Sequence, residues 1–81
     1  MAVKAYVLIV TDPVQTKTVL ARIRQIEAVK GAYEVMGPYD IVVEIEVEDL
    51  GDIPPILGEN IRRIDGIEST TSLVTFPERG A

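Results

Sequence analysis

Residues 40–47 alternate between apolar and acidic side chains, and this pattern constrains the fold more than any other stretch of the chain. The odd positions from 41 to 47 are all isoleucine or valine, whereas Glu44 and Glu46 occupy even positions. Successive side chains of a β-strand point to opposite faces, so this segment is predicted to be a strand with one buried face. That arrangement is typical of an antiparallel sheet covered by helices on one side only.

Five further elements are predicted from composition and spacing. A first helix is expected after Asp12, which suits an N-cap, with Pro13 at the first helical position and Gln15 completing a capping-box spacing. The Pro54-Pro55 pair is tolerated only in a first turn, so a second helix is expected to start near Asp52. The expected elements are a strand over 3–11, a helix over 13–28, a strand over 32–36, the strand over 40–47, a helix from about 52 that ends at Gly66, and a strand over 68–76.

This order of elements predicts the topology. It reads β-α-β-β-α-β, in a single domain over residues 1–77 with a short C-terminal tail over 78–81. Right-handed crossovers place both helices on one face of a four-stranded antiparallel sheet. The expected fold class is therefore α+β, a ferredoxin-like βαββαβ sandwich.

The connection between the second and third strands raises a problem of register. A two-residue turn at Pro38-Tyr39 would put Glu34 on the same face as Val43, under the helices, where an unpaired carboxylate is costly. A shift by one residue would move Glu34 to the opposite face. The sequence therefore predicts an odd-length loop or a bulge near Gly37, where glycine permits a positive φ.

The first strand is apolar on both of its faces, although the helices are expected to cover only one. Its free face, together with a neighbouring strand, would expose a contiguous apolar patch. We expect this face to pack sheet to sheet in a homodimer. The predicted dimer-interface residues are Tyr6, Leu8, Val10 and Val42.

Composition excludes several classes of function. The 81 residues contain no cysteine and no histidine, which removes disulfides, thiolate metal sites and the commonest general base. The net charge is −5, so the basic footprint of a phosphate-backbone binder is missing. No run approaches the roughly 18 apolar residues of a membrane span, and no signal-peptide pattern is present. We expect a cytoplasmic, non-catalytic protein with no metal, no cofactor, no membrane contact and no direct DNA binding.

The turn Gly37-Pro38-Tyr39-Asp40 lies between two apolar runs and places an aromatic ring and a carboxylate where a strand resumes. Polar residues on a loop held by a rigid hairpin suit ligand recognition. The alternative is an ordinary hairpin turn in which Asp40 bonds to backbone amides. Both interpretations stay open at this level.

Three stretches together resemble a known pattern. Residues 35–43 carry a glycine, a variable residue, an aromatic and an aspartate before an alternating strand, residues 47–50 carry an acidic pair, and residues 66–71 open with glycine and include a Ser/Thr run. Their order and spacing resemble the effector domain of the Lrp/AsnC family, called the RAM domain, for regulation of amino-acid metabolism. The resemblance covers nearly the whole chain.

The resemblance implies that the chain binds an amino acid at contacts between dimers, within a homo-oligomer such as an octamer or decamer, and takes part in regulating amino-acid metabolism or transcription. Asp40 would accept the ligand's ammonium, backbone amides near Gly37 and the Ser/Thr hydroxyls would bind its carboxylate, and Tyr39 would close over its aliphatic part. The implied ligand-binding residues are Met36, Gly37, Pro38, Tyr39, Asp40, Ser69, Thr70 and Thr71.

The chain departs from the family pattern at its start. Full regulators of this family carry an N-terminal helix-turn-helix, whereas this chain begins directly at its first strand and so resembles a stand-alone effector domain. Two alternatives remain. The domain could act as a structural adaptor that co-assembles with full-length Lrp/AsnC regulators, or it could be an ACT-type effector domain, which shares the strand order.

Overall fold

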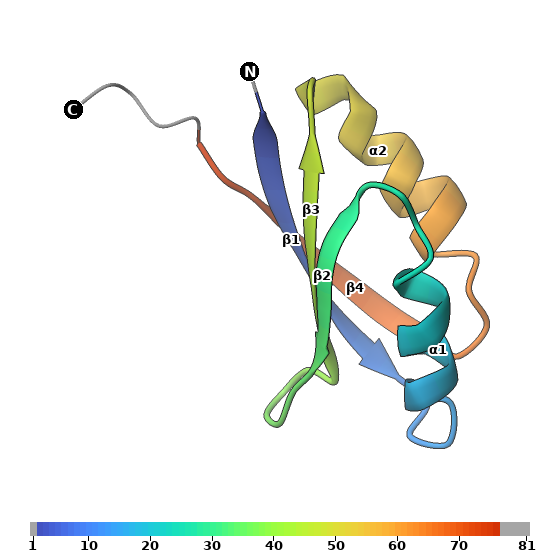
Figure 1. Ribbon diagram of the computed structural model, residues 1–81. Helices are drawn as coiled ribbons and strands as arrows, with labels where there is room; N and C mark the ends of the chain where they lie inside the picture. The colour runs from blue at the N-terminus through green and yellow to red at the C-terminus, as the bar shows by residue number, and fades with distance from the viewer. Residues whose placement is uncertain (1, 77–81) are drawn as a thin grey trace.

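The computed structural model describes residues 2–76 and has the expected order of elements (Figure 1). Four strands form one antiparallel sheet in the order β2-β3-β1-β4, and the helices lie together on one side of it. The expected ferredoxin-like α+β sandwich is therefore confirmed, while the predicted tail over 78–81 lies outside the described residues. The elements are β1 (Val3–Thr11), α1 (Thr16–Ile23), β2 (Val29–Glu34), β3 (Ile41–Val47), η1 (Leu50–Asp52), α2 (Ile53–Pro55), η2 (Ile56–Ile61) and β4 (Ile67–Val74).

The hydrophobic core fills the space between the sheet and the helices. The central strands β1 and β3 supply it from alternate positions, and Ile9 pairs with Ile41 across the two strands. Burying an isoleucine side chain fully stabilises a fold by roughly 1.5–3 kcal/mol, so this layer supplies the main driving force. Its buried members are Ala5, Val7, Ile9, Val19, Leu20, Ile23, Ala32, Ile41, Val43, Ile45, Ile53 and Ile61.

The first helix is shorter than the sequence suggested, and the expected capping box is wrong. The N-cap position is Gln15, without a side-chain cap bond, because residues 12–15 form a turn instead. Gln15 N–H donates to the Asp12 carbonyl at 2.8 Å, and Val14 N–H donates to Asp12 Oδ1 at 3.1 Å. Residues 24–28 also form turns rather than helix, since the chain must reverse to enter β2 at Val29.

The second helical segment begins as a 3₁₀ turn at Leu50, slightly before the expected start, and its later part widens. Pro54 and Pro55 lie in the short α-helical turn, where their missing N–H groups are tolerated. From Ile56 the segment is a π-helix, in which Arg62 N–H donates to the Leu57 carbonyl at 2.9 Å, five residues back. No pattern of residues along this segment predicted the widening.

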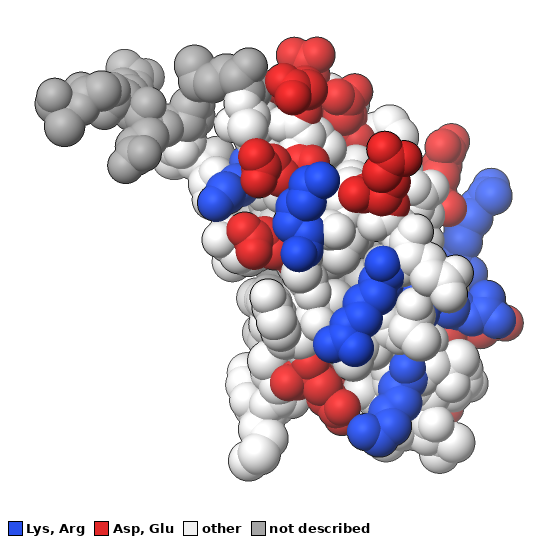
Figure 2. All heavy atoms as spheres, in the orientation of Figure 1, with Lys and Arg blue, Asp and Glu red and all other residues white. Residues whose placement is uncertain are grey.

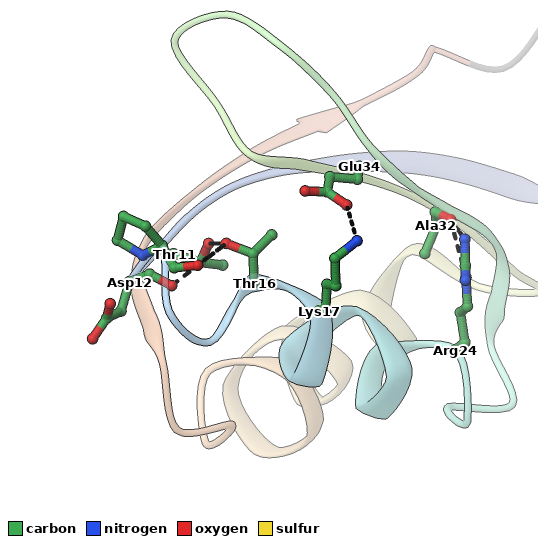
Figure 3. Close-up of polar contacts among 8 residues, drawn as sticks. Thr11, Asp12, Thr16, Lys17, Arg24, Ala32 and Glu34 are labelled. Atoms are coloured by element: carbon green, nitrogen blue, oxygen red, sulfur yellow. Dashed lines mark hydrogen bonds and ion pairs between the residues drawn. The ribbon is translucent and has the colours of Figure 1, made fainter.

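The expected odd-length loop or bulge near Gly37 is wrong. Glu34 pairs with Ile41, so Glu34 does lie on the helix-covered side, and the register shift in this pair of strands falls between Val29 and Gly31 instead. The carboxylate is tolerated because β2 is an edge strand and Lys17 Nζ of α1 lies 3.6 Å from Glu34 Oε1 (Figure 3). The expected positive φ of Gly37 is present, at +133°.

Gly66 is a position where only glycine fits, and its substitution tests the packing of α1 against the start of β4. Its φ is +102°, and an added Cβ would lie 2.9 Å from Gln15 Cβ and 3.0 Å from Val19 Cγ2. Because strain at a left-handed residue costs about 1–3 kcal/mol, we expect Gly66→Ala to lower the free energy of unfolding by about that amount in urea denaturation.

The matched control is Gly58→Ala. Nothing lies within 4 Å of a Cβ added there, and the residue is helical, so alanine should leave stability unchanged or raise it by about 0.5–1 kcal/mol. Equal stability of the Gly66→Ala variant and the unaltered protein would contradict the close packing at this turn.

Candidate functional site

The loop between β2 and β3 forms the first half of the candidate site. Val35 N–H donates to the Asp40 carbonyl at 2.9 Å and closes a four-residue turn. Within it, Met36 is 99% exposed and Gly37 has its positive φ. The loop extends beyond one end of the sheet, away from α2 (Figure 1). Its side chains are therefore available to a ligand or to another copy of the chain.

Asp40 is half-buried at the base of this loop and binds to β1. Its Oδ2 accepts the Thr11 N–H at 2.8 Å and lies 3.4 Å from Thr11 Oγ1, while its own N–H donates to the Ile9 carbonyl at 2.8 Å. The carboxylate therefore has a structural role, as the turn interpretation expected. Both contacts fall on Oδ2, so within residues 2–76 Oδ1 has no hydrogen-bond donor and remains open to a ligand.

A small polar cluster fixes the strand end to which Asp40 binds. Thr11 Oγ1 and Thr16 Oγ1 lie 2.6 Å apart in a buried hydrogen bond that joins the end of β1 to the start of α1 (Figure 3). The Thr11 amide lies at the end of β1, where the pairing of β1 with β4 shifts register between Val10 and Thr11. The carboxylate of Asp40 satisfies that amide, and buried backbone donors require such a partner.

The Ser/Thr run on β4 forms the second half, and the structure divides it between two faces. Thr70 pairs with Ile9 and so lies on the helix-covered side, where Arg62 Nε donates to Thr70 Oγ1 at 3.3 Å. Ser69 and Thr71 pair with Val10 and Leu8, so they lie on the free face. The three hydroxyls therefore do not converge on one point.

The two halves lie at the same end of the sheet but do not meet within one chain. Asp40 precedes β3 and Thr70 lies on β4, with β1 between them. Two inter-strand spacings separate them by about 10 Å. Within one chain β1 therefore lies between the two halves of the candidate site.

The free face of the sheet carries the four residues expected at a dimer interface. Tyr6, Leu8, Val10 and Val42 are all half-buried and lie side by side through the pairing of β1 with β3. Two more exposed members of this face were not among the expected residues. Tyr33 pairs with Val42 and Leu73 pairs with Tyr6, and these two side chains are 57% and 52% exposed. Their place depends on strand pairing, which alternation along one strand does not reveal.

Charge on the surface is mixed. On the face shown in Figure 2, lysine and arginine side chains alternate with carboxylates, and no continuous basic surface is present there. In the described part of the chain, no group of acidic residues is arranged to hold a metal ion. No helix within residues 2–76 is long and apolar enough to cross a membrane.

Known proteins share both the sequence pattern and the fold. The family model for the Lrp/AsnC ligand binding domain matches residues 4–79. The structure of TTHA0845 from Thermus thermophilus is 25% identical with a TM-score of 0.90, and the match covers 98% of this chain and 99% of that one. A transcriptional regulator from Neisseria meningitidis, NMB0573, solved in complex with L-Met, has the same fold, with a TM-score of 0.82 at 12% identity, over 98% of this chain and 53% of that one.

A curated relative places the same sequence pattern in an enzyme. Homocitrate synthase from Sulfurisphaera tokodaii is 44% identical over 62 residues, which are 75% of this chain but only 13% of the synthase. The domain thus matches almost all of one protein, about half of a regulator and a small part of a synthase. With the family model matching nearly its whole length, this chain belongs to the Lrp/AsnC ligand-binding domain family.

Proposed function

We propose that the protein is a non-catalytic effector domain that binds a free amino acid in the cytoplasm and regulates amino-acid metabolism or transcription. The observation that carries this proposal is the half-open carboxylate of Asp40, fixed by the Thr11 amide at the base of an exposed loop. An ammonium group requires such an acceptor. Membership of a ligand-binding family, and an L-Met complex of a regulator with the same fold, support an amino acid as the ligand.

The site is proposed to form between copies of the chain. The loop 36–40 and the Ser/Thr run are about two strand spacings apart with β1 between them, which favours a site whose two halves come from different protomers. Met36, Pro38 and Tyr39 would enclose the ligand from the loop side. A chain of this length buries only about 60% of its unfolded surface, so association also stabilises the fold.

The free face of the sheet is proposed as the dimer interface, and further contacts would build an octamer or decamer. The apolar side chains on this face include Leu8 on β1, one of the two central strands of the sheet. Packing them against a second copy removes them from water, which is favourable in proportion to the area buried. The same face would let the domain assemble with larger chains that carry it.

The substitution Leu8→Glu tests the dimer. A carboxylate buried in an apolar interface is costly, so the variant should be monomeric or unfolded at micromolar concentration, whereas the unaltered protein is oligomeric by light scattering. The control is Val14→Glu, which places the same charge on a side chain that is 90% exposed in the turn before α1 and should leave the assembly intact. A monomeric unaltered protein would rule out the interface.

Asp40→Asn separates the charge of this residue from its structural bond. The amide oxygen still accepts the Thr11 N–H, so the melting temperature should change little. Loss of a charge-assisted hydrogen bond should weaken amino-acid binding by about ten- to hundredfold in calorimetric titration, or about 1.5–3 kcal/mol. Asp40→Ala should lower both affinity and stability.

Asp49→Asn is the matched control, because Asp49 is an exposed carboxylate just beyond the opposite end of β3. This variant should bind the amino acid with the affinity of the unaltered protein. If the Asp40→Asn protein bound the amino acid with unchanged affinity, Asp40 would have only its structural role in the turn. If no amino acid binds the unaltered protein, the adaptor role becomes the better account.

The domain is not expected to bind DNA on its own. Its net charge is −5, and binding to a phosphate backbone depends on Lys and Arg that displace condensed counterions. A gel-shift assay at low salt should show no retardation of duplex DNA. Tight binding that weakens steeply as salt is added would contradict this expectation.

A further inference from the structure

A hollow of about 350 Å³ lies beside the start of β4, and three of its five lining residues have no role in the site described above. Arg62, Ile67, Glu68, Ser69 and Thr70 line it. Its volume falls at the small end of the range for small-molecule sites. Its lining residues supply one cation, one carboxylate, the Thr70 hydroxyl and an apolar side chain, which are groups that suit an α-amino acid.

Arg62 extends from the end of η2 to this hollow. Its Nε donates to Thr70 Oγ1 at 3.3 Å, which fixes one edge of the guanidinium against β4. Within residues 2–76 Arg62 has no carboxylate partner, whereas Lys4 and Lys17 are each paired with a glutamate. The two Nη groups therefore remain available, in the fork geometry that matches a carboxylate.

The position of Arg62 at a helix end does not by itself explain why its guanidinium is held against Thr70. Cations are favourable near the last carbonyls of a helix, and Arg63 has nearly the same position. Arg63, however, does not line the hollow, and its side chain has no hydrogen bond or ion pair within the described residues. Of the two arginines, Arg62 is the one held against Thr70. The Thr70 oxygen accepts from Nε, so its own O–H remains free to donate to a second acceptor in the hollow.

Glu68 gives the hollow its second charge. It lines the same space as Arg62, yet the two side chains form no ion pair within the described residues, so neither charge neutralises the other. A simple carboxylic acid would meet repulsion from Glu68, and a simple amine would meet repulsion from Arg62. A zwitterion satisfies both, because its carboxylate faces the guanidinium and its ammonium faces the carboxylate.

We infer that Arg62, together with the Thr70 hydroxyl, binds the carboxylate of the ligand, and that Glu68 selects ligands that carry an α-ammonium beside that carboxylate. This inference rests on the proposed function and names the side chains by which the site would distinguish a free α-amino acid from its amide and from its des-amino acid. Asp40 of a neighbouring copy completes the ammonium site, since an ammonium has three donors.

The experiment is a calorimetric titration of the full chain with the twenty amino acids. The amino acid of highest affinity is then compared with its primary amide and its des-amino carboxylic acid. The unaltered protein should bind the amino acid about ten- to hundredfold more tightly than either analogue. The Arg62→Gln variant should bind the amino acid no more tightly than its amide. The Glu68→Gln variant should bind the amino acid no more tightly than its des-amino acid.

Arg63→Gln is the control and should keep both preferences, and melting curves of all variants show whether the fold is intact. Arg62 is exposed, so its replacement should leave the melting temperature unchanged. An Arg62→Gln protein that still prefers the amino acid over its amide by the original factor would overturn the role of Arg62. Failure of every amino acid to bind the unaltered protein would instead overturn the proposed function.

Discussion

The pairing of β1 with strands on both sides determines the rest of this structure. One set of its side chains, Ala5, Val7 and Ile9, is fully buried under the helices, and the alternate set lies on the free face. The same strand separates Asp40 from Thr70 and so keeps the two halves of the candidate site apart. The core, the proposed dimer interface and the geometry of the candidate site therefore all depend on one strand that is apolar on both faces.

The carboxylate of Asp40 connects this strand to the loop that is proposed to bind a ligand. By accepting the Thr11 amide at 2.8 Å, it compensates for the irregular end of β1, and through Thr11 it is connected to Thr16 at the start of α1. A structural role and a binding role are therefore compatible in one side chain. A carboxylate held rigid by one oxygen loses little further entropy when the other oxygen binds an ammonium.

The features that depend on local periodicity could be predicted from the sequence. Alternation along β3, together with the capping, proline and glycine signals between elements, indicated the order of elements and the buried face of that strand. The ends of α1 were wrong because Asp12 forms a turn with Val14 rather than a cap. The register of Glu34 was wrong because Lys17, seventeen residues earlier and on another element, makes that carboxylate tolerable. The same limit applies to the faces on which the expected site residues lie. Ser69, Thr70 and Thr71 look alike in sequence, yet pairing with β1 sends Thr70 to one face and its neighbours to the other. Such roles depend on contacts between elements, which a period of two or 3.6 residues does not encode.

The two edges of the sheet differ in a way that bears on assembly. At β2, Arg24 donates to the outward carbonyl of Ala32 through Nε at 3.2 Å and Nη2 at 2.9 Å, which protects that edge from strand addition (Figure 3). At β4, Leu73 and Val74 remain 52% and 45% exposed, and the Arg62 hollow opens beside the same strand. Within the described residues the β4 edge is therefore the more open of the two, and the proposed second half of the amino-acid site lies beside it.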